Sequence, residues 1–346
     1  MSAKYAIIID AGSSGSRAHI YEYSQDKNLP DALPTIKQVS SKKTKPGLST
    51  FTKSIDSIWG DHFEPLIKHA EEIIPSNLHA STPIFIQATA GMRLIKPKYR
   101  KNILKETCKS LKKNSKFLIN ECADHVCVID GDTEGIYGWI ALNYLSEKLT
   151  NDLTPYGFMD MGGASTQLAF SPTNQEDLVE HGDDMYKVSL RKNNGELVDW
   201  QIFVSSWLGF GANEARNRQL SSLLNVLPKG VNYDVDGDGK GDITDPCSPD
   251  GMKIEFEYDD KMYSITGSGD YETCIKTIYP LLLKNMKCSK EPCLFNGIHG
   301  PKMDWSKEKI VGVSEYWYTA NDVFKLGGTY DYEKFELATK DFCSTN

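Results

Sequence analysis

The sequence lacks any apolar run long enough to cross a membrane. A bilayer-spanning helix needs roughly 18 or more continuous apolar residues, whereas the best segment, residues 278–283, is short and interrupted by Pro280. Near the start, the apolar residues 5–9 are too few for the core of a secretory signal and lead into Asp10 rather than a small-residue cleavage site. The sequence itself therefore predicts neither a membrane span nor a signal peptide.

Excess positive charge is lacking as well. The 346 residues include 39 Lys and Arg against 47 Asp and Glu, so the formal net charge is −8. Nucleic acids and anionic membranes attract proteins through positive charge, and this balance gives no electrostatic reason to expect either partner. The chain is long enough for two domains of roughly 150 residues each, and 40% apolar residues can supply a core for both.

The sequence also lacks cysteines at the spacing that is typical of zinc ligands. The eight cysteines stand at positions 108, 122, 127, 247, 274, 288, 293 and 343. None forms a CxxC pair with histidines at zinc-ligand spacing, so a zinc site is not predicted. An even number of scattered cysteines fits buried thiols or disulfides, of which we favour disulfides. Cys288 and Cys293 flank a short polar loop that a disulfide can close, and no Asn-x-Ser/Thr glycosylation acceptor occurs.

What the sequence does contain is an alternation of apolar strands with helices, which indicates an α/β protein. Strands are expected at residues 5–10, 18–23, 84–86, 127–129, 156–160 and 168–170. A helix is expected over residues 134–149, with Ile136, Ile140 and Tyr144 recurring on one face at four-residue spacing.

Two turns in this pattern are alike, each made of a strand, an aspartate, small residues rich in Gly and Ser, and a return strand. The first turn is residues 10–17 (DAGSSGSR) and the second turn is residues 160–167 (DMGGASTQ). Turns of this kind aim several backbone N–H groups at one anion, and an aspartate there is placed to hold a divalent cation through water. One such turn is usually only a turn, but the pair predicts a clamp for polyphosphate.

Glu134 stands between the two turns in the sequence, in the first turn of its expected helix. The helix dipole favours the ionised carboxylate, while nearby phosphates raise its pKa. A carboxylate held between these effects can take a proton from water. An ordinary acidic residue at a helix N-terminus is the alternative, and the position between the two turns favours the catalytic interpretation.

With these residues in place, the sequence resembles the apyrase family, the nucleoside triphosphate diphosphohydrolases, and most of all its fungal Golgi branch. Four ordered signature regions carry the resemblance: residues 10–17 (DAGSSGSR), 88–93 (ATAGMR), 130–145 (DGDTEGIYGWIALNYL) and 159–170 (MDMGGASTQLAF). Residues 207–213 (WLGFGAN) and 315–322 (EYWYTAND) resemble the Golgi type rather than the cell-surface type. The family's fifth region is absent, so the resemblance implies a chain that is truncated at its C-terminus.

The resemblance implies an actin-like (RNase H-like) α/β fold with a nucleotide cleft between two lobes, residues 1–150 and an incomplete lobe of residues 151–346. It implies a monomer that hydrolyses nucleoside di- and triphosphates such as GDP, UDP and ATP to the monophosphate, with Ca²⁺, Mg²⁺ or Mn²⁺ as cofactor. The place implied is the Golgi lumen, where the enzyme clears nucleotide by-products of glycosylation and is anchored through a C-terminal membrane segment not contained in this sequence. The alternative is an actin-fold nucleotide-binding module or phosphotransferase without efficient hydrolysis, although Glu134 and Gln167 serve water rather than a sugar hydroxyl.

The family motifs assign roles to individual residues. Asp10 and Asp160 match the positions that hold the metal through water, and Glu134 matches the general base. The phosphate cradle is Ser13, Ser14, Gly15, Ser16 and Arg17 with Gly162, Gly163, Ala164 and Ser165, and the residues that orient the water are Thr89, Ser165 and Gln167. Tyr318 matches a ring that stacks on the base, with a core aromatic as an equal alternative. Ala212 replaces the arginine of cell-surface relatives, so that contact is lost or passes to Arg216.

The resemblance also implies a pairing of the cysteines. The expected disulfides are Cys108–Cys122, Cys247–Cys274 and Cys288–Cys293. Cys127 is expected to be free, and Cys343 to have lost its partner.

An acidic loop lies outside these motifs. Its carboxylates, Asp234, Asp236, Asp238, Asp242 and Asp245, match positions 1, 3, 5, 9 and 12 of a calcium loop, with Gly239 at position 6. Aspartate at the last position shortens the bidentate reach, and flanking helices are not evident because Pro228 precedes the loop and Pro246 follows it. A structural Ca²⁺ site and a solvated acidic turn are equal interpretations.

Overall fold

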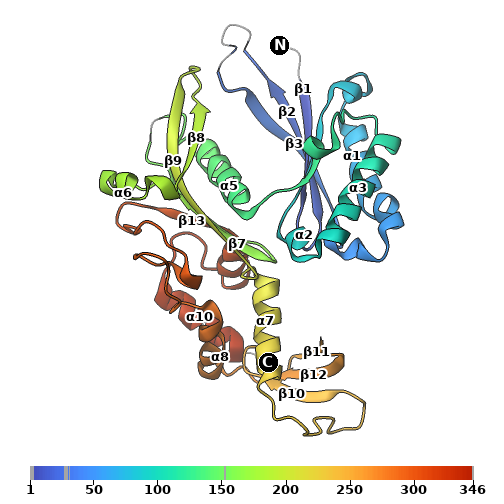
Figure 1. Ribbon diagram of the computed structural model, residues 1–346, viewed down its shortest axis with the longest axis vertical. Coiled ribbons are helices and arrows are strands. Elements are labelled where there is room, and N and C mark those ends of the chain that lie inside the picture. Colours follow the sequence, from blue (N-terminus) through green and yellow to red (C-terminus); the bar gives the residue numbers. More distant parts are fainter. Residues whose placement is uncertain (1–3, 27–29, 31, 152, 345–346) are drawn as a thin grey trace. The chain divides into compact units, whose positions relative to one another are not determined.

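The computed structural model describes residues 4–26, 30, 32–151 and 153–344 (Figure 1). The chain divides into two compact units, the first formed by Met1–Gly211 with Met303–Val311 and the second by Ala212–Lys302 with Gly312–Asn346. Both turns belong to the first unit, as do the strands of both five-stranded sheets except β13 (Ile310–Ser314), which crosses from the first unit into the second. The expected lobe boundary at residue 150 separates these two sheets, whereas the compact units divide at Gly211, so that boundary stays a prediction.

The first sheet contains the first turn. It consists of β1 (Lys4–Ala11), β2 (Ser16–Ser24), β3 (Thr35–Thr44), β4 (Ile84–Ala88) and β5 (Val126–Val128), in the spatial order β3-β2-β1-β4-β5. β1 and β2 form the expected antiparallel hairpin, and β1, β4 and β5 run parallel. The carboxyl ends of these three strands therefore meet at one edge, which is where open α/β sheets bind their ligands.

Helices cover this sheet on the side where α1 and α3 lie in Figure 1. The helices of this region are α1 (Glu64–Ile73), α2 (Ala90–Leu94), α3 (Pro97–Asn114) and α4 (Cys122–His125). Ile7 and Ile9 alternate along β1 and are fully buried, as are Ile86 of β4 and Leu66 of α1. These residues belong to one continuous hydrophobic core, so the apolar runs read from the sequence are the buried strands of this sheet.

The second sheet contains the second turn. It consists of β6 (Gly157–Met161), β7 (Ser165–Phe170), β8 (Tyr186–Arg191), β9 (Leu197–Leu208) and β13 (Ile310–Ser314), in the order β13-β6-β7-β9-β8, with α6 (Gln175–Glu180) between β7 and β8 in the chain. β6 and β7 form the second expected hairpin. β7 is the central strand and is buried along its whole length. The second turn therefore leads into the interior of this unit.

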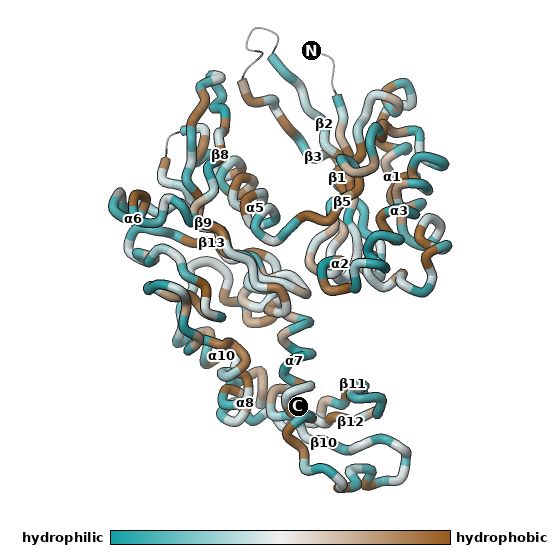
Figure 2. Tube along the Cα trace, viewed as in Figure 1, coloured by the Kyte–Doolittle hydropathy of each residue, from teal (hydrophilic) through white to brown (hydrophobic). Residues whose placement is uncertain are grey.

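Helix α5 (Gly131–Leu145) links the two sheets in the chain, and it begins and ends earlier than the expected helix over residues 134–149. Ile136, Ile140 and Tyr144 are only half-buried, whereas the buried face consists of Gly131, Gly135, Trp139 and Asn143. Glycine lets α5 approach the second sheet closely, since a Cβ at Gly135 would lie 2.8 Å from Val204 Cγ1. Figure 2 shows the hydrophobic segment that leads from β5 into this helix. The spacing of apolar side chains does not reveal this buried face of α5, because glycines form part of it.

The second unit has its own small core. It contains α7 (Ala212–Asn225), β10 (Gly241–Asp245), β11 (Lys253–Tyr258), β12 (Lys261–Gly267), α8 (Tyr271–Ile278), α9 (Glu315–Trp317) and α10 (Tyr332–Ser344). The strands form a three-stranded sheet in the order β10-β12-β11. Leu220 and Leu224 of α7 pack with Ile243 of β10 and Ile265 of β12.

The cysteine pairing is confirmed. The three disulfides are Cys108–Cys122, Cys247–Cys274 and Cys288–Cys293. Cys127 and Cys343 are free thiols, the first half-buried and the second buried. Within the described residues, no helix combines the length and the apolarity that crossing a bilayer requires.

Candidate active site

The carboxyl ends of the parallel strands bring three separate segments together at the first turn. Thr89, which follows β4, donates its backbone N–H to the carbonyl of Ala11 at 3.2 Å, and Ile129, which follows β5, donates to the carbonyl of Ala88 at 3.0 Å. Asp130 then caps α5, because its carboxylate accepts the N–H of Thr133 at 2.7 Å. The order of the strands therefore places Thr89 beside the first turn, while its role in orienting water stays a prediction.

The first turn is shaped mainly by backbone packing. A Cβ at Gly47 would overlap the carbonyl oxygen of Ser13, and a Cβ at Gly91 would lie 2.7 Å from the Cα of Ser13. Ser14 and Arg17 are exposed, whereas Gly15 and Ser16 are buried. Five of the predicted cradle residues thus lie on this turn, and the close packing of Gly47 and Gly91 constrains the path of its backbone.

A histidine that the sequence analysis missed supports this turn from behind. His62, on the π-helical segment η3 (Ile58–Phe63), is fully buried, and its Nε2 lies 2.6 Å from Ser16 Oγ. Burial lowers the pKa of His62 to about 4, so the ring is neutral at physiological pH. Nothing in the local sequence around His62 indicates this contact, because it depends on how η3 packs against β2.

The second turn is organised by polar side chains. Gln167 pairs across the strands with Asp160 on one side and with Ser206 on the other, so these three side chains share one face of the sheet. Gln167 is 1% exposed, and its Nε2 lies 2.7 Å from Ser165 Oγ, 3.1 Å from Ser206 Oγ and 3.3 Å from Glu134 Oε2. An amide has two N–H donors, so three acceptors compete for them.

Glu134 joins this network from α5, and Arg93 joins it from α2. The Nη2 of Arg93 donates to Glu134 Oε2 and lies 3.4 Å from Ser165 Oγ. Arg93 ends the signature segment of residues 88–93, but the motif alone gives this arginine no role. The signal was present, since a lone arginine at the end of a strand-to-helix signature is a candidate partner for carboxylate or phosphate.

The electrostatics of this network raise the pKa of Glu134 to about 7. Removal of the carboxylate from water is the main cause, and the carboxylates of Asp160 and Asp10 add to it, while the Arg93 guanidinium opposes the rise. Only 20% of the Glu134 side chain is exposed. A carboxylate with a pKa near neutrality can both accept and release a proton under physiological conditions.

Asp10 and Asp160 form a donor set that fits a hard divalent cation. The pKa of Asp10 is raised chiefly because neighbouring residues displace water from around its carboxylate, and further by the Asp160 carboxylate, while His19, Arg17 and Lys43 oppose the rise. Mutual repulsion between carboxylates is relieved by a bound cation, and Mg²⁺ or Ca²⁺ takes oxygen ligands. Both aspartates therefore fit the role that the resemblance implied, although the ion and its coordination stay predictions.

Two residues named from the resemblance, Tyr318 and Arg216, belong to the second unit. Tyr318 belongs to the second unit, on the π-helical segment η8 (Tyr318–Val323), and its side chain is 47% exposed, which argues against the core alternative. Its stacking role stays a prediction. Arg216 binds Asp245 through Nη1 at 2.7 Å and Ser248 through Nη2 at 2.6 Å. Its guanidinium is therefore already engaged inside the second unit.

The acidic loop is only partly assembled. Carboxylate oxygens of Asp234, Asp236 and Asp238 lie within 4.8 Å of one another. Asp242 instead accepts the backbone N–H of Val235 at 3.1 Å. Asp245 is fully buried and is bound by Arg216, so the structure does not bring the twelfth position to the loop. The calcium interpretation stays a prediction for the first three carboxylates.

Comparison with known proteins places these features in a family. A model of the GDA1/CD39 (nucleoside phosphatase) family matches residues 1–346. The Golgi apyrase of Saccharomyces cerevisiae is 47% identical over 99% of this chain and 58% of its own length. That of Schizosaccharomyces pombe is 39% identical over 100% of this chain and 60% of its own. The chain thus spans less than two thirds of the length of these relatives.

Among solved structures, a nucleoside triphosphate hydrolase from Neospora caninum aligns with a TM-score of 0.56 at 14% identity, covering 99% of this chain and 79% of that chain. Such low identity speaks for the fold alone. It confirms the expected α/β fold class, in which two sheets each carry a hairpin turn.

Proposed function

Because the chain belongs to the GDA1/CD39 (nucleoside phosphatase) family, we propose that it hydrolyses nucleoside di- and triphosphates such as GDP, UDP and ATP. The products are inorganic phosphate and, at the end, the nucleoside monophosphate. One observation carries the proposal: Glu134, Gln167 and Ser165 converge in one buried network, and Asp10 and Asp160 raise the pKa of its carboxylate. The network contains a base and two groups able to orient water.

In this mechanism Glu134 acts as the general base. Gln167 and Ser165 hold a water molecule in line with the terminal phosphorus, and Thr89 assists from the end of β4. The water oxygen bonds to phosphorus while the bond from phosphorus to the bridging oxygen breaks, and the water proton passes to Glu134. No covalent enzyme intermediate forms.

Charge neutralisation comes from the two turns. Backbone N–H groups of residues 13–17 and 162–165 cradle the phosphates, and Arg17 adds a positive charge at the exposed end of the first turn. Asp10 and Asp160 would hold a divalent cation through water, and this ion would neutralise negative charge on the phosphates. The hydrogen bond from Arg93 keeps the Glu134 carboxylate in place between one catalytic event and the next.

The setting of the reaction is proposed from relatives. Two similar yeast proteins bear the name Golgi apyrase. We place this chain in the same role, as a monomer in the Golgi lumen that clears nucleotide by-products of glycosylation. Tyr318 stacks on the nucleotide base.

Phosphate release from GDP, UDP and ATP with Ca²⁺, Mg²⁺ or Mn²⁺ tests the proposal. Glu134→Gln should lower kcat by about 10² to 10⁴-fold, because general-base catalysis contributes that much. Asp132→Asn is the matched control, since Asp132 lies in the same first turn of α5, and it should stay within about threefold. Equal rates for wild type and Glu134→Gln would show that the base is wrong. Nucleotide binding without turnover by either protein would favour the binding-module alternative.

A further inference from the structure

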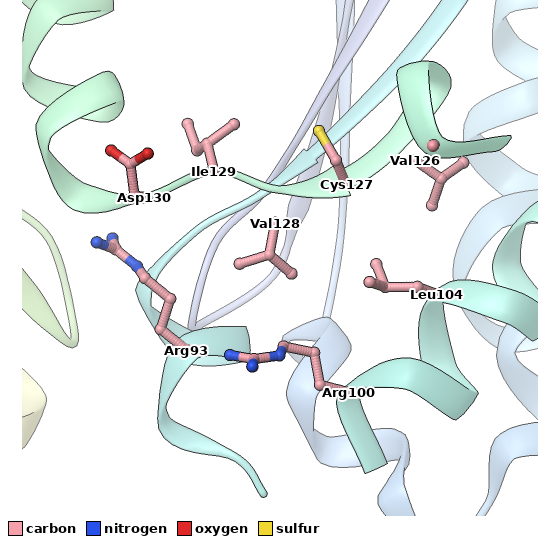
Figure 3. Close-up of a pocket in the computed structure, with 9 residues that line it drawn as sticks. Arg93, Arg100, Leu104, Val126, Cys127, Val128, Ile129 and Asp130 are labelled. Carbon is pink, nitrogen blue, oxygen red and sulfur yellow. The ribbon is translucent and has the colours of Figure 1, made fainter. Parts of the chain in front are cut away.

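A groove of about 520 Å³ lies beside the candidate active site (Figure 3). It is lined by Arg93, Arg100 and Asp130 together with apolar side chains that include Leu104, Val126 and Val128. Val126 and Val128 point to the α3 side of β5, as the alternation of a strand requires. None of the roles assigned to the two turns uses this groove.

The charged side chains of its lining are Arg93, which is also paired with Glu134, together with Arg100 and Asp130. Arg93 projects from α2 and Arg100 from α3, and Figure 3 shows the guanidinium of Arg93 directed toward Asp130. Arg100 is half-buried and takes part in no ion pair among the described residues. Asp130 contributes one negative charge, but its carboxylate is held by the N–H of Thr133. Apolar walls strengthen the attraction of the two arginines for an anion.

The lining offers a nucleotide base no ring on which to stack. No aromatic side chain is among the residues that line the groove, and bases are bound chiefly by stacking on aromatic rings. Two guanidinium groups next to aliphatic side chains fit a small oxyanion, whose oxygens accept paired N–H donors from arginine. The volume leaves room for the water that such an ion retains.

Arg93 connects the groove with the reacting groups. Its guanidinium contacts Glu134 and Ser165, and the same side chain lines the groove. We propose that the groove is a subsite for the inorganic phosphate that hydrolysis releases, with Arg93 and Arg100 as its two anion-binding residues. This inference rests on the proposed function. Phosphate that forms beside Glu134 then moves along the groove from Arg93 to Arg100. This movement changes only its non-covalent contacts with the two arginines.

Titration of the metal-free, nucleotide-free protein with inorganic phosphate tests the subsite directly. Arg100→Gln should weaken phosphate binding at least fivefold, and Arg100→Lys should give an intermediate value because it keeps the charge but loses the paired donors. Lys101→Gln is the matched control, because Lys101 is the next residue of α3, is exposed and does not line the groove. Equal phosphate affinities for Arg100→Gln and Lys101→Gln would overturn the proposal.

Product inhibition gives a second readout. The inhibition constant of phosphate against nucleotide hydrolysis should rise in Arg100→Gln and stay at the wild-type value in Lys101→Gln. An unchanged inhibition constant would mean that phosphate binds only at the two turns, and the subsite would be wrong. Absence of hydrolysis by wild type would instead reject the proposed function, while the phosphate titration would still decide whether the groove binds an anion.

Discussion

The first and second turns share one sequence pattern but are built differently. Gly47 and Gly91 press on the backbone of the first turn, and the fully buried His62 supports it. In the second turn, Gln167 and Ser165 belong to a polar network that reaches Glu134. The two similar motifs therefore have different roles: the first turn forms an anion cradle, and the second turn positions reacting groups.

The largest effect should come from glycines that touch each turn from outside. A Cβ at Gly47 would overlap Ser13, and one at Gly211 would lie 2.5 Å from the N of Ser165. Because backbone atoms cannot move aside cheaply, Gly47→Ala and Gly211→Ala should each lower the free energy of unfolding by more than about 3 kcal/mol. Denaturant unfolding measures the change.

Gly60→Ala is the control for both variants. No heavy atom lies within 4 Å of a Cβ placed at Gly60, so this change should be neutral or stabilise the protein by up to about 1 kcal/mol. A Gly211→Ala variant as stable as Gly60→Ala would mean that backbone packing shapes only the first turn, and the comparison would become sharper still.

The two turns should also have opposite pH dependence of stability. Folding raises the pKa of Glu134 from 4.5 to about 7, so the folded state holds an extra proton and stability falls as pH rises through that window. Burial lowers the pKa of His62 from 6.5 to about 4, so stability falls as pH drops from 6.5. Each effect is on the order of 3 kcal/mol, and together they should cancel between pH 4.5 and 6.5.

Variants separate the two contributions in metal-free protein. Glu134→Gln should lose stability on acidification below pH 6.5, and His62→Gln should lose stability as pH rises toward 7. The slope is the readout, so a constant loss of stability in either variant does not affect the test. If Glu134→Gln shows the same pH profile as wild type, the raised pKa of Glu134 is wrong.

Much of this fold could be predicted because a short run of apolar residues in the sequence indicates a buried strand. The strands at residues 5–10 and 84–86 were recognised as apolar runs, and both belong to the first core. β3 was missed, since its sequence TIKQVSSKKT is polar and it lies at the edge of the sheet. The buried face of α5 was missed because Gly131 and Gly135 form it.

The site was predictable only as far as its motifs extend. Asp10, Glu134 and Gln167 stand in recognisable segments, so the sequence could nominate them. The contact of Arg93 with Glu134 spans 41 residues, and that of His62 with Ser16 spans 46. Contacts of this kind depend on the order of strands and on helix packing, which a local pattern does not contain.

The smallest of these effects compares positions that correspond in the two hairpins. Arg17 pairs with Asp10 as Gln167 pairs with Asp160, yet Arg17 is exposed and Gln167 is buried. Gln167→Leu should lower kcat about 100-fold, or about 2.7 kcal/mol, because it removes the donors near Glu134. Arg17→Leu should instead raise KM by about tenfold with kcat retained, since a contact present throughout the cycle contributes only uniform binding. Steady-state kinetics with GDP separate the two parameters, and a fall in kcat for Arg17→Leu would place the first turn in the chemical step as well.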